Sequence, residues 1–289
     1  MKLSHADAPP PFQPGKPVGN VYYGACSWTD RTLIDGGIFY PANARTAADR
    51  LAYYASQFPI VEVDATYYAL ASERNAHLWV ERTPSGFLFN IKAFGLFTHH
   101  PVPIERLPEA VKELLPHSAA EKNRVYLSDV PEEARTLIWE MQVQALAPLA
   151  AAGKLGCMLF QFPHWFTARR DNIDYLQRLR ERTAWPIAVE FRGGGWMTDN
   201  YQARTLILLE KLGLAYVVVD EPQGFRSSTP PVVASTSRLA VPLRQAPCFI
   251  VVSPQAPSEP RRCCIQKPKY RGRLGSRSTS PPVRANGAC

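Results

Sequence analysis

The chain has 289 residues, 46% of them hydrophobic, which is enough to bury one large α/β core or two smaller ones. The first residues lack the apolar run of a secretion signal, and no stretch approaches the ~18 uninterrupted apolar residues of a membrane-spanning helix, so we expect a soluble cytoplasmic protein with no membrane partner. The net charge of +8 lies in residues 241–289, which leaves 24 basic and 24 acidic residues in 1–240 and gives a nucleic-acid partner no support.

The chain begins with a leader, residues 1–19, whose five prolines predict disorder. From residue 20 onward, short apolar stretches typical of strands alternate with stretches of helical spacing. We predict strands at 21–28, 60–68, 87–94, 156–162, 187–192 and 214–220. We predict helices at 46–58, with Thr46 as N-cap, at 76–83, within 131–155, at 174–183 and at 200–213.

This alternation predicts parallel βαβ units, for which an open doubly wound sheet and a (β/α)₈ barrel are both suitable folds. No G-x-G-x-x-G follows the first strand, as a dinucleotide-binding fold would require. Polar residues end nearly every predicted strand rather than gathering at one switch point. That distribution favours a TIM-like barrel, in which many strand ends contribute to one site.

Strand periodicity predicts which of these polar residues face together. Glu62 and Asp64 share one face of their strand, and Glu190 and Arg192 share one face of theirs. The large apolar residues would then pack against the outer helices. The expected site at the carboxyl ends comprises Glu62, Asp64, Lys92, Gln161, Glu190, Arg192 and Asp220. The alternative is that these side chains form a network of salt bridges inside the fold that only fixes the register of the strands. For Asp220, the alternative is that it only caps a turn.

We assign candidate roles by side-chain chemistry. Glu190, Asp220 and His99 are the candidate acid–base residues, although two adjacent loop histidines, His99 and His100, are also typical of solvated positions. Substrate binding is assigned to Arg192, Lys92, Glu62, Asp64, Gln161, Trp28, Tyr68 and Trp196. Aromatic residues at strand ends suit stacking on a sugar or base, or serve as apolar plugs. We expect no metal and no cofactor, because no histidine pattern of a metal site occurs. Cys26 and Cys157 are interpreted as small buried hydrophobic residues.

Several stretches occur together in one order: GACSW (24–28), IFYP (38–41), LAYYASQFPIVEVDATYY (51–68), WVERTPSGFLFNIKAF (79–94), GKLGCMLFQFP (153–163), VEFRGGGW (189–196) and DEPQGF (220–225). With them, residues 20–240 resemble the domain-of-unknown-function 72 (YecE-like) family. The resemblance implies a TIM-like barrel of a mostly bacterial, cytoplasmic family with no settled reaction. Two departures are Asp64, where the family has an amide, and Gly193, where many members have a histidine.

The third departure is the tail, residues 241–289, which does not match. Eight prolines, nine basic residues and a single acid make it unlike any barrel strand or helix. We hypothesise that it arises from a change of reading frame or a sequencing error and is disordered. A barrel without its last two strands would be incomplete, with about six strands and an exposed edge.

Three functions follow. The first is an enzyme acting on a phosphorylated, sugar or nucleic-acid substrate, with Glu190 or Asp220 as base and with Lys92 and Arg192 stabilising negative charge. The alternative is a non-catalytic protein that binds a small anion or a nucleotide. The third is an inactive, truncated product.

Overall fold

A computed structural model describes residues 15–17, 21–198, 200–217 and the backbone of 248–252. The chain divides into two units, Met1–Gln255 and Ala256–Cys289, and all described residues belong to the first. Apart from residues 15–17, the predicted leader 1–19 lies outside the described residues, and so does most of the tail. None of the described helices is both long and apolar enough to cross a membrane.

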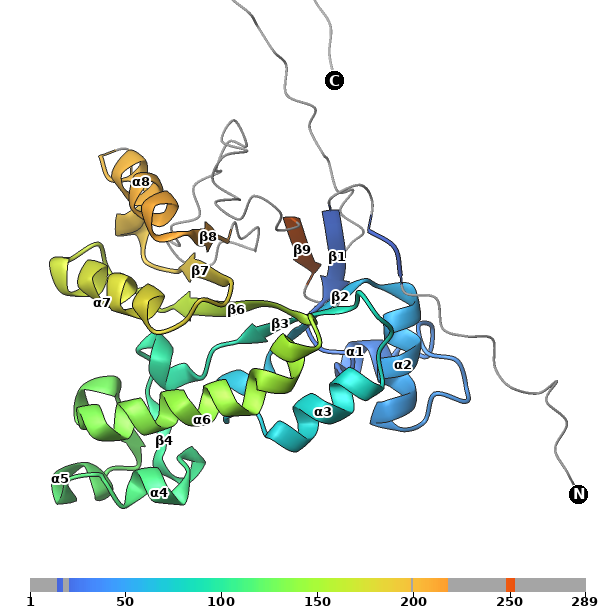
Figure 1. Ribbon diagram of the computed structural model, residues 1–289, viewed down its shortest axis with the longest axis horizontal. Helices are drawn as coiled ribbons and strands as arrows, with labels where there is room; N and C mark the ends of the chain where they lie inside the picture. The colour runs from blue at the N-terminus through green and yellow to red at the C-terminus, as the bar shows by residue number, and fades with distance from the viewer. Residues whose placement is uncertain (1–14, 18–20, 199, 218–247, 253–289) are drawn as a thin grey trace, which may run out of the picture. The chain divides into compact units, whose positions relative to one another are not determined.

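Five parallel strands form the main sheet, in the order β2 (Ile60–Val63), β3 (Leu88–Lys92), β6 (Leu155–Phe162), β7 (Ile187–Phe191) and β8 (Leu214–Tyr216) (Figure 1). The first strand, β1 (Val21–Ala25), continues this order beside β2: a parallel bridge joins Cys26 to Glu62, and the Ser27 amide donates to the Glu62 carbonyl over 2.8 Å. The predicted α/β fold with a mainly parallel sheet is confirmed. The described strands do not close into a barrel.

One further strand, β9 (Cys248–Val252), pairs in parallel with β1. The expectation that the tail contains no strand is therefore wrong for these five residues. The segment reads CFIVV, and such a run of β-branched and aromatic residues forms a strand despite the prolines on either side.

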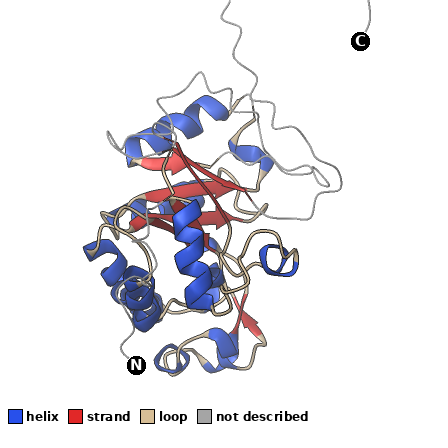
Figure 2. Cartoon of the chain, turned by 90° about the vertical axis from the view of Figure 1, so that its right-hand side faces the viewer, coloured by secondary structure: helices blue, strands red, loops and turns tan. Residues whose placement is uncertain are grey.

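The predicted helices are all present (Figure 2). The longer ones are α2 (Ala47–Gln57), α3 (Glu73–Glu81), α6 (Glu132–Ala151), α7 (Arg170–Glu181) and α8 (Gln202–Leu212). The Thr46 hydroxyl caps α2 by accepting from the Asp49 amide, and the Asp49 carboxylate accepts from the Thr46 amide. Shorter turns are α1 (Arg31–Asp35), α4 (Glu109–Lys112), α5 (His117–Ala120), η2 (Ala65–Tyr67), η3 (Gly95–Thr98), η4 (Ile104–Arg106), η5 (Leu127–Asp129) and η6 (Gly194–Trp196). A small antiparallel pair, β4 (Val102–Pro103) and β5 (Arg124–Val125), lies between residues 100 and 130.

The two faces of the main sheet differ in character. On one face, the apolar residues of the strands share a core with the helices, as Val63, Ile91 and Val189 do with Leu51 of α2 and Leu176 of α7. On the other face, a small apolar cluster of Cys157, Leu159 and Ala188 accompanies the polar residues of the strands. The site therefore lies on the face that the helices leave free.

Candidate functional site

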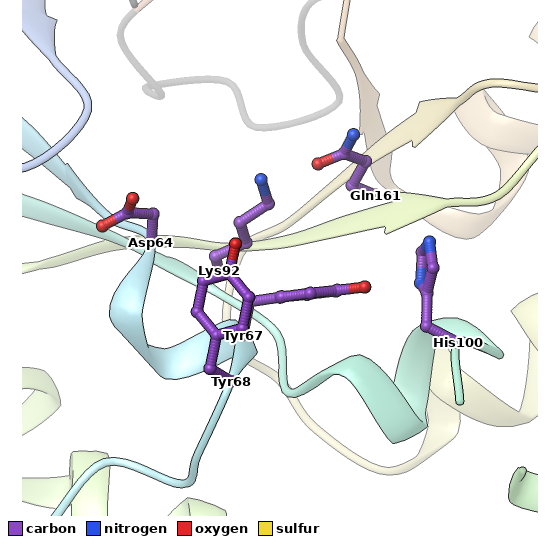
Figure 3. A pocket seen from close by; sticks show the side chains of 6 residues that line it. All are labelled: Asp64, Tyr67, Tyr68, Lys92, His100 and Gln161. Carbon is purple, nitrogen blue, oxygen red and sulfur yellow. The ribbon is translucent and has the colours of Figure 1, made fainter. Parts of the chain in front are cut away.

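A pocket of about 260 Å³ opens at the carboxyl ends of β2, β3 and β6. Figure 3 shows the six residues that line it: Asp64, Tyr67, Tyr68, Lys92, His100 and Gln161. Five of the six have a side chain that carries a charge or can exchange a proton, and the sixth, Gln161, has an amide, so the pocket is polar. It lies at the edge of the sheet where the sequence predicts the site.

The first wall of the pocket forms because β2 ends earlier than predicted. The expected strand at 60–68 stops at Val63, and the chain turns into η2. The Thr66 hydroxyl lies 2.9 Å from the carbonyl oxygen of Val63 and 2.6 Å from that of Lys92, which ties this turn to the end of β3. The turn brings Tyr67 and Tyr68 beside the strand ends.

Lys92 lies at the centre of the site. Its Nζ atom is 5.7 Å from the centroid of the Tyr67 ring, a cation–π arrangement. The described residues place no carboxylate in an ion pair with it. Its positive charge lowers the pKa of Glu62 and that of His100, although burial is the larger influence on both. The ammonium group is therefore close to both residues and directed into the pocket (Figure 3).

A buried polar layer, formed by Cys26, Glu62 and Asn90, lies on the same face one step further from the strand ends. The Cys26 thiol donates to Glu62 Oε1 over 3.4 Å. Burial raises the pKa of Glu62, and the charges of Glu190 and Asp64 raise it further. Asn90 is 4% exposed, and its Oδ1 atom has no hydrogen-bond partner among the described residues. Cys26 is thus a polar partner of Glu62 rather than a hydrophobic residue.

Glu190 and Arg192 form an ion pair beside the pocket. Arg192 Nε lies 2.5 Å from Glu190 Oε1, and Glu190 is 6% exposed. Glu190 is the register partner of Gln161, which lines the pocket, but neither member of the pair lines it. Glu190 and Arg192 therefore meet on one side of their strand, as predicted, and form an ion pair of the kind that the salt-bridge alternative describes.

The two histidines after β3 are separated by the structure. His99 packs its ring against Phe162, Phe166 and Tyr175, at centroid distances of 6.3, 5.0 and 4.5 Å, and does not reach the pocket. His99, which was assigned to the site, therefore lies among core aromatic rings instead of in the pocket, at the residue where a left-handed backbone (φ 61°) ends η3. His100 lines the pocket instead.

Burial also decides the outcome for the tryptophans assigned to substrate binding. Trp196 is 1% exposed, stacks on Phe191 at 4.3 Å and donates from Nε1 to the Phe166 carbonyl. Trp28 packs edge-on against Trp79 and Phe89. Trp196 is thus a core residue and Trp28 is partly buried against the core, and neither lines the pocket.

Three other predictions have different outcomes. Tyr68, Asp64, Lys92 and Gln161 line the pocket as the sequence analysis assigned them. Asp220 lies outside the described residues.

At Gly193, a Cβ atom would lie 2.8 Å from the His164 carbonyl oxygen, so a histidine there needs a shift of that loop. No three His, Cys, Asp or Glu side chains within the described ranges are grouped to hold a metal ion.

Sequence reasoning overlooked Asn90 and gave His100 less weight than His99. Strand periodicity carries the signal for Asn90, which lies two residues before Lys92 and therefore on the same face. No comparable signal exists for His100, because η3 breaks the strand periodicity before the histidines.

The chain was compared with known proteins. Residues 22–245 match the family described as "Protein of unknown function DUF72". The UPF0759 protein YunF of Bacillus subtilis (strain 168) is 30% identical over 218 residues, which span 75% of this chain and 66% of that protein. A DUF72 family protein of Thermotoga maritima MSB8 is similar with 29% identity and a TM-score of 0.52, over 73% of this chain and 68% of that one. One from Enterococcus faecalis V583 has 23% identity and a TM-score of 0.52, over 76% and 68%, and supports the fold alone.

Proposed function

Because this chain belongs to the DUF72 family, whose description names no function, we propose a function from the pocket itself: it binds a small, hydroxyl-bearing molecule that carries a phosphate group. Lys92 carries this proposal. Its ammonium group enters a polar pocket without an ion-paired carboxylate among the described residues. A phosphate oxygen would supply the charge-assisted hydrogen bond that the ammonium group lacks.

The neighbours of Lys92 suit the rest of such a ligand. Asp64 accepts hydrogen bonds from hydroxyl groups, and Gln161 both donates and accepts them. The negative charge near Lys92 is limited in two ways. Burial raises the pKa of Glu62 and so favours its neutral form, and Glu190 is paired with Arg192. An anionic ligand therefore meets less electrostatic repulsion than the presence of the three acids Asp64, Glu62 and Glu190 would suggest.

Calorimetric titration with ribose 5-phosphate and with ribose tests this function. We expect the phosphate ester to bind more tightly, and Lys92→Gln to reduce that preference about 10- to 150-fold, the range for a hydrogen bond between charged groups. The matched control is Lys122→Gln, because Lys122 is paired with Asp129 outside the pocket. Equal binding of both compounds to the unmodified protein would overturn the proposal.

A second candidate, proton transfer to or from the bound ligand, is favoured by the state of His100. Burial and the Lys92 charge lower the pKa of His100 to about 4, so its ring is neutral near pH 7. The Thr98 hydroxyl donates to the Gly95 carbonyl at 3.0 Å and lies 2.9 Å from His100 Nδ1. Nδ1 then carries the proton, and Nε2 is left as an acceptor, which suits a general base.

This candidate has its own measurement. In the hydrolysis of a sugar phosphate, His100 Nε2 would take a proton from the attacking water, the P–O ester bond would break, and the sugar oxygen would leave with that proton as a hydroxyl group. Phosphate release should then show an acidic limb near pH 4 that disappears in His100→Gln. Turnover with the same pH profile in that variant rules out His100 as the base.

The barrel and the cellular location also belong to this proposal. The proposed barrel is supported by the order of the described strands, β9, β1, β2, β3, β6, β7 and β8, because consecutive strands of a (β/α) barrel are neighbours. The free thiols of Cys26 and Cys157 suit a reducing, cytoplasmic compartment, and the relatives named above are from bacteria.

A further inference from the structure

A continuous row of aromatic rings borders one side of the pocket. We call it the aromatic lip, and it consists of Tyr68, Tyr67, His100 and Trp165. Successive ring centroids are 5.0, 5.3 and 5.8 Å apart, and each pair meets edge to face or nearly so. Three of the four rings line the pocket itself, and Trp165 extends the row beyond it.

The lip leaves aromatic surface uncovered at both ends. Tyr68 is 64% exposed and Trp165 is 47% exposed. The other aromatic residues near these strand ends, such as Phe162 and Trp196, are buried in the core. Trp165 is nevertheless held in place, because its Nε1 atom donates to the His99 carbonyl oxygen over 3.3 Å. Exposed aromatic rings that adjoin a polar pocket are typical of a ligand-stacking surface.

From this arrangement we propose that the ligand is a nucleoside monophosphate, whose base stacks on the aromatic lip while its phosphate binds Lys92. This inference rests on the proposed function of the pocket. The pocket, at about 260 Å³, is smaller than the ~300–1,000 Å³ that encloses a drug-sized ligand, so it admits the phosphate and the sugar and leaves the base outside. The base then meets the exposed rings.

The charges limit the length of the nucleotide. Among the described residues, Lys92 is the one lysine or arginine that lines the pocket, and residues 1–240 carry no net charge. A strand of nucleic acid requires a basic groove along its backbone. One phosphate on one ammonium group fits a mononucleotide better than a polynucleotide.

Titration calorimetry of the full chain with AMP, ribose 5-phosphate and adenosine tests the inference. We expect AMP to bind about 5- to 150-fold more tightly than ribose 5-phosphate, the range for stacking of one base on an aromatic ring. Trp165→Ala should reduce this ratio several-fold, and Trp165→Phe should retain most of it. The matched control is Tyr201→Ala, which removes a ring of similar exposure on the first residue before α8 and should preserve the ratio.

The outcomes separate the two proposals. A ratio near one in the unmodified protein, or a ratio that Trp165→Ala does not change, overturns the stacking inference while the phosphate site stands. Binding of adenosine without binding of ribose 5-phosphate overturns the phosphate site and keeps the lip. If none of the three compounds binds, both proposals are wrong.

Discussion

His99 and His100 are adjacent in sequence, yet their side chains lie on opposite faces of the sheet. His99 packs against Phe162, whose side chain belongs to the helix-side core, whereas His100 lines the pocket together with Gln161. Residues 161 and 162 of one strand point to opposite faces, so the two histidines do as well. One has become part of the core and the other part of the site.

The first prediction concerns the pH dependence of stability. Burial lowers the pKa of both His99 and His100 to about 4, from 6.5 in the unfolded chain. Between these values the unfolded state binds more protons than the folded state, so stability is greatest above pH 6.5 and falls as the pH drops toward 4. Each excess proton contributes at most about 1.4 kcal/mol per pH unit.

Thermal unfolding of the wild-type protein and of His99→Phe from pH 7 to pH 4 measures this effect. We expect the variant to lose less stability over this range, since it has one fewer buried base and keeps a ring in the aromatic core. His117→Asn, at an exposed position, is the control and should behave like the wild type. An identical pH dependence in His99→Phe contradicts the assignment.

The second prediction concerns Glu62. Burial raises the pKa of Glu62, so the folded protein favours its protonated form over its ionised form. The stability that this preference contributes is fully present below the pKa of Glu62 in the unfolded chain. It is lost as the pH rises through the pKa of Glu62 in the folded protein. The isosteric change Glu62→Gln should therefore improve stability relative to wild type more at pH 8 than at pH 5, by on the order of 1 kcal/mol. Urea unfolding at the two pH values gives the comparison. A larger benefit at pH 5 is the contrary result.

The third prediction concerns the ion pair of Glu190 and Arg192. Arg192→Met removes one partner of a carboxylate that is 6% exposed, and we expect a loss of about 1–3 kcal/mol in the free energy of unfolding. The loss should lie below that of a fully buried pair, since the arginine side chain is 30% exposed. Glu190→Gln combined with Arg192→Met should recover part of it. A double-mutant cycle from chemical denaturation measures the coupling, and strictly additive losses would argue against the pair.

The fourth prediction concerns Gly24, where β1 lies against β2. A Cβ atom at this position would be 2.1 Å from the Ile60 carbonyl oxygen, which is a backbone atom that cannot rotate away. Gly24→Ala should therefore cost at least about 2–3 kcal/mol by separating the two strands. Gly195→Ala is the matched control, because nothing lies within 4 Å of its Cβ position. Similar melting temperatures for the two variants would show that β1 tolerates the shift.

Much of the fold is predictable because it depends on local patterns. All six predicted strands and all five predicted helices have a counterpart in the structure, although β2 ends at Val63 and β8 at Tyr216, before the predicted ends. The same periodicity correctly places Lys92 and Gln161 on one face, because alternation along a strand is a property of the backbone itself. It fails in turns, and Asp64 and His100 reach the pocket through η2 and η3 rather than through strands.

The amino-acid sequence alone determined the order of the strands along the chain, the polar face of the sheet and the family. Only the tertiary structure decided which residues reach the pocket, since this depends on contacts between segments far apart in sequence. Trp196 is buried in the core and Trp28 packs against it, while Tyr68 and Trp165 also have ring neighbours but stay exposed at the pocket. Likewise, Glu62 and Cys26 became partners across 36 residues, because β1 and β2 lie side by side. Local preference cannot encode such pairings, because their energy exists only once the chain has folded.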